Sequence, residues 1–432
     1  MKTLYKGTKI VGEKGNVYHI DSVISVGTGQ GDIYKVCNDR KEIFAFKLFH
    51  TGNPKKIRRQ IERLMQRGQA CDAFVMPIEI VTIQNRIGYI MEFIGDEFIN
   101  AAALFNGVEY QGRMVELTWN EKLSILSEIV NAFNILNNAK LGIMDIKFDN
   151  IKIDLENLRV KILDTDTIVY TDEKPCVLGT IGFMPPNTMT RKEAPNENND
   201  VYAIAVFIFM TLLGAHPLDG KRRTQKCNEN IDTYLFGTHP VYMFHPTDAS
   251  NRPIPQDGYS RNQQRVIDKF QRYPAYFKMA MQKAFVDGLY DAKMRPSLQE
   301  WGEILERLYN DSFICENCGE EYFFENTDKT CVVCKQELLK PIFIKSEYGK
   351  SVPLFNGLTI FSKDVWPTTN NYKIFKVVET KYNGRYGLEN LLSESATLIF
   401  PDGNKREFGP GEAIPIFMDC EIQIENQKIY FM

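Results

Sequence analysis

The sequence predicts an α+β chain in which a mostly β lobe is followed by a mostly α lobe, a cysteine-rich segment and a small all-β domain. From residue 18 to 94, short β-branched and aromatic runs are separated by Gly, Asn and charged residues, a pattern typical of strands. From residue 119 to 308 the apolar residues instead recur at the helical period. We therefore expect two lobes at 1–94 and 95–309, a cysteine ribbon at 310–340 and a β domain at 341–432.

The first lobe is expected to hold a five-stranded sheet and one helix. Its strand-like runs are VYHIDSVISVG, GDIYKVCN, EIFAFKLFH, MPIEIVTIQ and RIGYIMEFI. The helix is predicted from Pro54 to Arg67, because its apolar residues fall on one face, namely Ile57, Ile61, Leu64 and Met65.

The second lobe is predicted to begin with a long amphipathic helix over 120–139. A loop, two short strands in NIKI and VKIL and further helices follow. The apolar run 201–215 predicts a helix that is buried on all sides.

Composition narrows the classes of protein to consider. The 432 residues carry a formal net charge of −3, with 44% hydrophobic and 25% charged residues, which is ordinary globular usage. This composition argues against wholesale disorder and against a globally basic nucleic-acid binder. Residues 1–20 have charges inside every apolar run, and the run 201–215 is shorter than the roughly 20 residues that cross a bilayer. We expect a cytoplasmic protein with no membrane partner.

A glycine-dense turn lies between the first two strand runs. Residues 26–34 read VGTGQGDIY, and glycine lets backbone amides approach phosphate oxygens that a Cβ would obstruct. Many such hairpins are only tight turns. Further along, Lys47 ends the apolar run FAFK, and Glu62 on the single predicted helix is its candidate partner. Lys47 is either an edge-strand charge or a lysine that positions phosphates.

Four polar residues near the two short strands of the second lobe carry candidate chemistry. Asp145, Lys147 and Asn150 lie within GIMDIKFDNIKI, and Asp164 follows in ILDTDT. An Asp can take the proton of an acceptor hydroxyl, a Lys can neutralise a moving phosphoryl group, and Asn with a second Asp can hold Mg²⁺. The alternative is that these residues only cap and turn the loop.

These motifs resemble those of the protein kinase superfamily over residues 18–308. The resemblance implies a two-lobed kinase-like fold that binds ATP. It also implies a glycine-rich loop, a phosphate-positioning Lys47 with Glu62 as its helix partner, and a hinge at 91–94 that binds adenine through its backbone. The implied nucleotide-binding residues are Gly27, Gly29, Gly31, Ile33, Ala45, Lys47, Glu62, Glu92 and Ile94.

The resemblance also implies residue roles in the second lobe. Asp145 is the implied catalytic aspartate with Lys147 beside it, and the implied ligands of Mg²⁺ or Mn²⁺ are Asn150 and Asp164. A lysine two residues after the catalytic aspartate is the Ser/Thr-type arrangement, so protein hydroxyls on Ser or Thr are the expected substrates. Three further matches are structural: Thr180 braces the catalytic loop, Asp200 anchors it, and Arg295 is a buried arginine.

Two departures from the family pattern lie in the catalytic region. Ile143-Met144 replaces the usual His-Arg, so the resemblance implies a kinase of the non-RD type, which we do not expect to be activated by phosphorylation of its activation loop. Thr165-Asp166 replaces the usual Phe-Gly. The additional carboxylate either binds metal or repels Asp164 when metal is absent.

Other departures concern the glycine loop and buried charges. The loop is one residue short if Gly27 and Gly31 are its outer glycines. Asn187 stands where a glutamate normally pairs with the buried arginine, so we expect Arg295 to find another acceptor. Lys152 falls where an apolar residue normally floors the adenine pocket, and only its alkyl stem can substitute.

Four of the nine cysteines form two Cys-x-x-Cys pairs separated by twelve residues: Cys315, Cys318, Cys331 and Cys334. Two such knuckles can present four thiolates to one tetrahedral ion, which predicts structural Zn²⁺ with no position open for water. Two disulfides or redox pairs are the alternatives, and a cytoplasmic chain disfavours the first.

A kinase followed by a zinc ribbon resembles the bacterial kinases of tellurite-resistance-type stress operons. That narrower resemblance rests on phrases such as PIEIVTIQNRIGYIMEF and GTIGFMPPN, and it implies a von Willebrand A protein and a metal-dependent phosphatase as partners. For the β domain, the alternatives are a docking or dimerisation sandwich and a phosphopeptide-binding one.

The sequence therefore predicts an ATP- and Mg²⁺-dependent Ser/Thr protein kinase. One alternative is a pseudokinase or scaffold that binds nucleotide or partners without phosphotransfer. The other is an adaptor built on the zinc ribbon, but the acidic ribbon sequence CENCGEEYFFENTDKTC repels phosphates and argues against a nucleic-acid partner.

Overall fold

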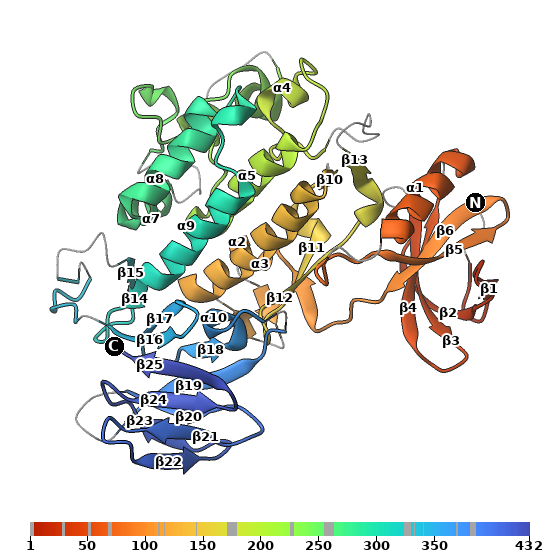
Figure 1. The fold of residues 1–432 in the computed structure, drawn as a ribbon. Coiled ribbons are helices and arrows are strands. Elements are labelled where there is room, and N and C mark those ends of the chain that lie inside the picture. The colour runs from red at the N-terminus through yellow and green to blue at the C-terminus, as the bar shows by residue number, and fades with distance from the viewer. Residues whose placement is uncertain are drawn as a thin grey trace.

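The structure is a computed structural model of the whole chain. It describes residues 4–27, 31–50, 53–67, 71–106, 108–110, 113–115, 117–143, 145–170, 179–224, 229–254, 263–323, 330–331, 333–339, 341–368, 370–380 and 386–432. Figure 1 shows a sheet lobe at the N-terminus, a helical lobe in the middle of the chain and a β domain at the C-terminus.

The N-terminal lobe is an antiparallel sheet with strand order β1-β2-β3-β4-β6-β5. The strands are β1 (Lys9–Val11), β2 (Val17–Ser25), β3 (Gly31–Asn38), β4 (Ile43–Phe49), β5 (Pro77–Ile83) and β6 (Arg86–Glu92). The prediction of five strands was wrong by one, because the short β1 alternates exposed and buried residues over only three positions.

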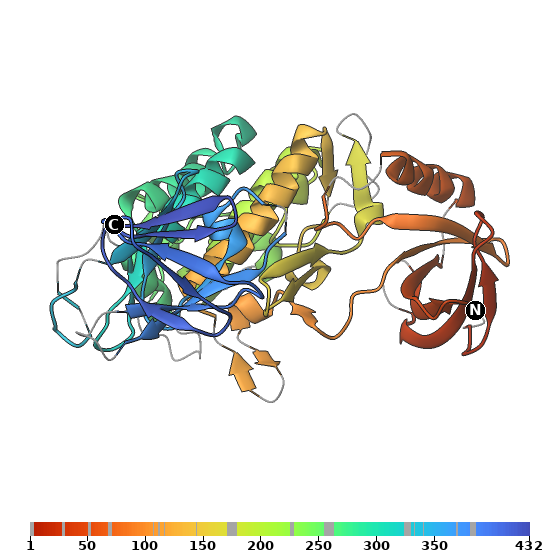
Figure 2. The same ribbon diagram turned by 60° about the horizontal axis from the view of Figure 1, so that its bottom comes forward.

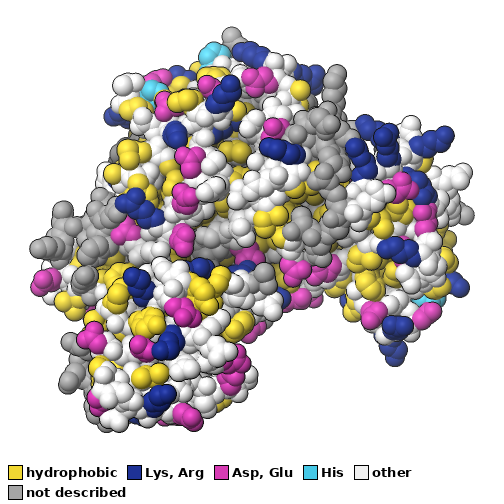
Figure 3. All heavy atoms as spheres, viewed as in Figure 1, with side chains coloured by type: hydrophobic (Ala, Val, Ile, Leu, Met, Phe, Trp, Pro, Cys, Tyr) yellow, Lys and Arg dark blue, Asp and Glu magenta, His cyan; other side chains and the backbone are white. Residues whose placement is uncertain are grey.

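One helix, α1 (Pro54–Arg67), packs against this sheet, as the sequence predicted. It buries Ile61 and Leu64, and its other face carries a basic patch that is visible over α1 in Figure 3. The basic side chains of that patch are Lys55, Lys56, Arg58, Arg59 and Arg63.

The second lobe is built around two long helices. α3 (Trp119–Asn138) begins at a capping box of Thr118 and Glu121, and α9 (Leu298–Asp311) begins at another of Ser297 and Glu300. α3 packs along α9 and also contacts α5 (Asn198–Leu213). In α5, thirteen of the sixteen residues are buried, which confirms the prediction of a helix surrounded by protein.

The remaining helices of this lobe are short. They are α2 (Ala103–Asn106), η1 (Phe148–Asn150), η2 (Thr165–Thr167), α4 (Pro186–Met189), η3 (Lys221–Thr224), α6 (Ile231–Thr233), η4 (Tyr234–Thr238), η5 (Ala249–Asn251), α7 (Gln263–Arg272), α8 (Ala275–Gln282), η6 (Lys283–Asp287) and η7 (Ala292–Met294). No helix in the described part of the chain is long and apolar enough to cross a membrane.

Short antiparallel strands lie between the two lobes, and residues 145–150 and 163–167 lie in the loops that follow two of them. They pair as β10 (Leu141–Ile143) with β13 (Ile168–Tyr170), and as β12 (Arg159–Ile162), β11 (Ile151–Asp154) and β7 (Phe98–Asn100). A further hairpin joins β8 (Val108–Tyr110) and β9 (Arg113–Val115).

The cysteine segment is packed onto the helical lobe. It follows α9 directly with β14 (Ser312–Ile314), which pairs with β15 (Glu321–Phe323). Phe323 is buried in the same apolar cluster as the core of the helical lobe. The ribbon also has a small apolar cluster of its own, formed by Phe313, Cys315, Tyr322 and Cys331.

The C-terminal domain consists of two antiparallel sheets around one apolar core. One has the order β17-β16-β25-β24-β21-β22 and the other β18-β19-β20-β23. Their elements are β16 (Ile342–Ser346), β17 (Ser351–Leu354), β18 (Thr359–Phe361), α10 (Ser362–Val365), β19 (Lys373–Glu379), β20 (Tyr386–Asn390), β21 (Ala396–Ile399), β22 (Lys405–Phe408), β23 (Ala413–Pro415), β24 (Glu421–Ile424) and β25 (Gln427–Phe431).

This β domain lies against the helical lobe, away from the N-terminal sheet, in both ribbon views (Figures 1 and 2). β17 contacts α9, Lys363 forms an ion pair with Glu128 on α3, and the Asn371 Nδ2 donates to the carbonyl of Asn157 at 2.9 Å. The domain that the sequence placed at the end of the chain is thus docked on the back of the helical lobe.

Candidate functional site

The glycine turn between β2 and β3 has the backbone that glycine favours. Gly27 has φ +70°, and a Cβ on Gly31 would lie 2.7 Å from the carbonyl oxygen of Leu48. Only glycine therefore fits at position 31 without moving the neighbouring strand β4. Gly29 lies outside the described residues.

A buried polar cluster anchors this turn, and sequence reasoning missed it. The Asp32 carboxylate accepts from the backbone N–H of Gly27 at 3.1 Å, lies 2.5 Å from His50 Nε2 and is approached by Arg86 at 3.4 Å. Burial by itself raises the pKa of Asp32, but the contacts with His50, Gly27 and Arg86 outweigh it and hold the pKa below the ordinary value. Asp32 therefore fixes the start of the turn as a charged acceptor.

Lys47 lies on β4, and its ammonium group is buried between two carboxylates. Its Nζ is 3.0 Å from Asp164 Oδ1 and 2.8 Å from Asp166 Oδ1. Burial lowers the pKa of Lys47, yet the two carboxylates overcome this and raise it. The lysine is thus a charged residue inside the site and not an edge-strand charge.

The structure does not bring Glu62 to Lys47. The Glu62 carboxylate is 46% exposed and lies 3.5 Å from Arg58, one helical turn earlier on α1. Such an i, i+4 pair forms on the outer surface of a helix. The expected pairing of Lys47 with Glu62 is therefore wrong for this structure.

The residues of the expected catalytic loop converge after β10. Lys147 Nζ lies 2.8 Å from Asp145 Oδ2, and Thr180 Oγ1 donates to Asp145 Oδ1 at 2.5 Å. The backbone N–H of Ile143 donates to the buried carboxylate of Asp200 at 2.7 Å. Burial raises the pKa of Asp200 well above its usual value. Thr180 and Asp200, which the resemblance implied as the brace and the anchor of this loop, therefore both contact it. Met144 lies outside the described residues.

Asn150 and Asp164 stand at the same end of the β11–β12 hairpin. Asn150 precedes β11, and its carbonyl accepts from the backbone N–H of Leu163 at 2.8 Å, which places Asp164 next in the chain beside it. The Asn150 Nδ2 donates to the carbonyl of Asp145 at 2.9 Å, so its Oδ1 is the atom left for a ligand. An amide oxygen and a carboxylate are donors that Mg²⁺ prefers, so the residues present fit this ion.

The residues expected around adenine lie on adjacent strands and on the segment that leaves β6. Ala45 is buried on β4 opposite Met91, and Ile33 stands opposite Lys47. Glu92 ends β6, and Ile94 follows on the connection between the lobes.

Two lysines lie close to this connection. Lys152 is half-buried opposite Lys161 in the β11–β12 pair. Lys161, which sequence reasoning missed, lies 2.8 Å from the Glu92 carboxylate and donates to the carbonyl of Asp72. The Glu92 side chain is therefore held by Lys161, which leaves its backbone for the expected contact with adenine.

Arg295 binds other acceptors in place of the missing glutamate, as expected from the sequence. Its Nε donates to the carbonyl of Gly288 at 2.7 Å and its guanidinium to the carbonyl of Asn198 at 3.0 Å, with the ring of Tyr202 5.2 Å away. Asn187 instead bonds Glu193 at 3.0 Å. Because carbonyl groups replace a carboxylate, burial lowers the pKa of Arg295.

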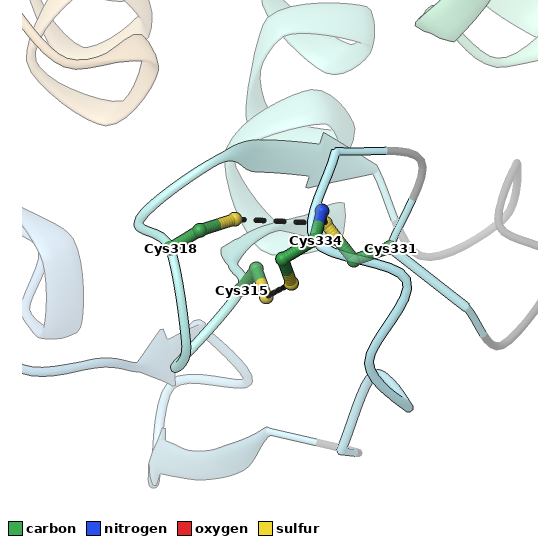
Figure 4. A group of neighbouring side chains, drawn as sticks. All are labelled: Cys315, Cys318, Cys331 and Cys334. Carbon is green, nitrogen blue, oxygen red and sulfur yellow. Dashed lines mark hydrogen bonds between the residues drawn. The ribbon is translucent and has the colours of Figure 1, made fainter.

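The four clustered cysteines face one another, as Figure 4 shows. The Sγ atoms of Cys315 and Cys334 are 3.6 Å apart, as are those of Cys318 and Cys331, and all four lie within 4.8 Å. A tetrahedron with metal–sulfur bonds of about 2.3 Å has edges of about 3.8 Å, so the cluster fits one such ion.

The two knuckles are built alike. Gly319 and Lys335, each the residue after the second cysteine of its pair, have φ +73° and +62°. The backbone N–H of Gly319 donates to the carbonyl of Cys315, and that of Lys335 to the carbonyl of Cys331. The repeated backbone turn gives the two knuckles the same local conformation.

Comparison with known proteins agrees with this geometry. The protein kinase domain family matches residues 18–285, more than half of the chain. Wall-associated receptor kinase 2 of Arabidopsis thaliana is 28% identical over 250 residues, 55% of this chain and 33% of the relative. The serine/threonine-protein kinase SRK2C of Arabidopsis thaliana is 23% identical over 225 residues, 51% of this chain and 63% of the relative. The chain thus spans between a third and just under two thirds of these curated relatives.

Proposed function

Because this chain belongs to the protein kinase domain family, we propose that it is an ATP- and Mg²⁺-dependent serine/threonine protein kinase of the non-RD type. The observation that carries the proposal is the contact set of Asp145, whose two carboxylate oxygens bind Lys147 and Thr180 while Asn150 holds its backbone. That arrangement places a cation beside the carboxylate of the proposed base.

Each residue has a distinct task in the proposed reaction. Asp145 accepts the proton of the acceptor hydroxyl, and Lys147 beside it offsets the negative charge that develops in transfer. Asn150 and Asp164 would hold the metal ion, and Lys47 with the glycine turn would hold the phosphates. Bound as its magnesium complex, ATP supplies the phosphoryl group.

The test is phosphate incorporation by the full chain. The wild-type protein is incubated with ATP and Mg²⁺ or Mn²⁺, and phosphorylated Ser and Thr are located by mass spectrometry. Asp145→Ala should abolish incorporation while ATP binding measured by calorimetry persists. Asp149→Ala is the matched control, because this neighbouring carboxylate is exposed and contacts only Asn100 among the described contacts. Equal incorporation in wild type and Asp145→Ala would refute the proposal.

The second candidate is a pseudokinase that binds nucleotide without transfer. The contact of Asp164 with Lys47 favours it, because the lysine ammonium group then occupies a carboxylate that is proposed to bind the metal ion. Retained nucleotide binding with no phosphate incorporation under either metal would establish this candidate.

The cysteine cluster is proposed to hold structural Zn²⁺, supported by its sulfur geometry and its four thiolate ligands. For the β domain at 341–432 we propose a docking role, supported by its contacts with α3 and α9.

The narrower resemblance adds proposals about context: a bacterial, cytoplasmic kinase that acts with a von Willebrand A protein and a metal-dependent phosphatase. Copurification of those two proteins with the tagged full chain tests the proposal that they are its partners.

A further inference from the structure

We propose that Asp166, and not Glu62, is the residue that positions Lys47, and that Gln60 links α1 to this pair. This inference deepens the proposed function and rests on it. It addresses which residue orients the phosphate-binding lysine.

Lys47 and Asp166 form the most enclosed ion pair of the site. The Lys47 side chain is 6% exposed and that of Asp166 is 4% exposed, with Nζ and Oδ1 2.8 Å apart. Tyr89, directly opposite Lys47 on β6, donates its hydroxyl to the same Oδ1 at 2.9 Å. A buried carboxylate with two donors is held in one geometry, and losing its charge would leave the buried lysine with a weaker partner.

Asp164 and Asp166 differ in exposure, which separates their tasks. The Asp164 carboxylate is 38% exposed, whereas Asp166 faces inward against the sheet. Asp164 can turn toward a metal ion while Lys47 keeps Asp166 as its counter-ion. Asp166 is therefore neither a second metal ligand nor only a repulsive neighbour of Asp164.

The phase of α1 explains why Glu62 is displaced. Successive helix residues are about 100° apart, so positions 60 and 62 point about 160° away from each other around the axis. Gln60 faces the site, where its Nε2 donates to the backbone carbonyl of Asp166. Glu62 then faces outward to Arg58. For Glu62 to reach Lys47, α1 would have to rotate and break the bond between Gln60 and Asp166.

The first test measures ATP affinity and steady-state kinetics for Asp166→Asn and Glu62→Gln in the full chain. Asp166→Asn keeps the size of the side chain and removes its charge, and it should weaken ATP affinity and lower kcat, each by about tenfold or more. Asp166→Glu should recover part of both losses. Glu62→Gln, which changes a carboxylate that the structure places outside the site, should stay within about twofold of wild type. A tenfold loss in Glu62→Gln with little change in Asp166→Asn would overturn the proposal.

A double-mutant cycle separates positioning from general support of the fold. If Asp166 acts through Lys47, Asp166→Asn should cause no further loss of ATP affinity in the Lys47→Met background. Additive losses would contradict the proposal. If Asp166→Asn does not fold, Glu62→Gln still tests the inference, because a large loss of ATP affinity in that variant would refute it.

These binding readouts do not depend on phosphate transfer. A chain that binds ATP and transfers no phosphate would refute the proposed function, and the cycle would still decide which carboxylate positions Lys47.

Discussion

The ring of Phe323, in the cysteine segment, stacks on Trp119 at the start of α3, with centroids 4.6 Å apart and planes inclined by 15°. Tyr273 packs against both rings, with its centroid 4.9 Å from that of Phe323 and 5.4 Å from that of Trp119. The backbone N–H of Trp119 also donates to the Glu321 carboxylate at 2.6 Å. The segment that carries the cysteines therefore covers the start of α3, the helix that precedes the loop of Asp145, and the two parts should unfold together.

Loss of a cysteine ligand should destabilise the helical lobe as well as the ribbon. Cys331 is fully buried in the cluster. Cys331→Ser should lose about one equivalent of zinc and unfold several degrees lower, because metal binding energy is folding energy. Zinc analysis and thermal unfolding measure both effects. Cys37→Ser, at a half-buried cysteine on β3, is the control and should keep its zinc. Full zinc content in Cys331→Ser would contradict the assignment.

Thr180 should matter through its hydroxyl. Its 2.5 Å hydrogen bond orients the Asp145 carboxylate, which is the proposed acceptor of the proton. Thr180→Ala should lower kcat by between about tenfold and about 150-fold, since a hydrogen bond to a charged group contributes about 1.5–3 kcal/mol. Thr180→Ser should restore most of the rate.

Steady-state phosphate transfer measures this effect. Thr190→Ala is the control, because that hydroxyl bonds only to nearby backbone carbonyls, those of Pro186 and Asn187. Equal rates for the Ala and Ser variants at position 180 would argue against a role for the hydroxyl.

His216 should make the stability of the chain sensitive to acid. It is buried in the neutral form, with Nδ1 accepting from the backbone N–H of Leu218 and Nε2 2.9 Å from the carbonyl of Gly182. Burial lowers its pKa from 6.5 to about 4.

The sign of this effect follows from proton binding. Between these two pKa values the unfolded chain binds a proton that the folded chain does not. The stabilisation is complete above pH 6.5, and about 3 kcal/mol of it is lost as the pH falls toward 4. Chemical denaturation from pH 4 to 7.5 should show a shallower slope in His216→Gln than in wild type. Equal slopes in the two proteins would contradict the assignment to His216.

The docked β domain should be held in part by Glu128 and Lys363, whose side chains are 20% and 28% exposed. Lys363→Glu places two carboxylates together and should lower the free energy of unfolding by about 1 kcal/mol or more. Combining it with Glu128→Lys should restore most of that loss. Denaturant unfolding measures the free energy of unfolding, and limited proteolysis of the connection between the helical lobe and the β domain reports whether the domain stays docked. Failure of the double variant to recover would show that the pair does not support docking.

Much of the site could be predicted from the sequence because it is local. Asp145, Lys147 and Asn150 lie within six residues of one loop, so their spacing largely sets their arrangement. The same holds for the two cysteine knuckles, in which a repeated four-residue turn sets each sulfur pair. The helix at Pro54–Arg67 was also predicted from its periodicity, which depends only on neighbouring residues.

Contacts between residues that lie far apart in the chain could not be predicted from the sequence. Whether Gln60 or Glu62 faces Lys47 depends on how α1 is rotated on the sheet, and burying Ile61 and Leu64 sets that rotation. Asp166 reaches Lys47 only because two lobes meet across more than one hundred residues of sequence. The residue types of the site could thus be predicted from their spacing in the chain. Which carboxylate each cation contacts depends on packing, because the rotation of α1 and the meeting of the two lobes set the distances between these charges.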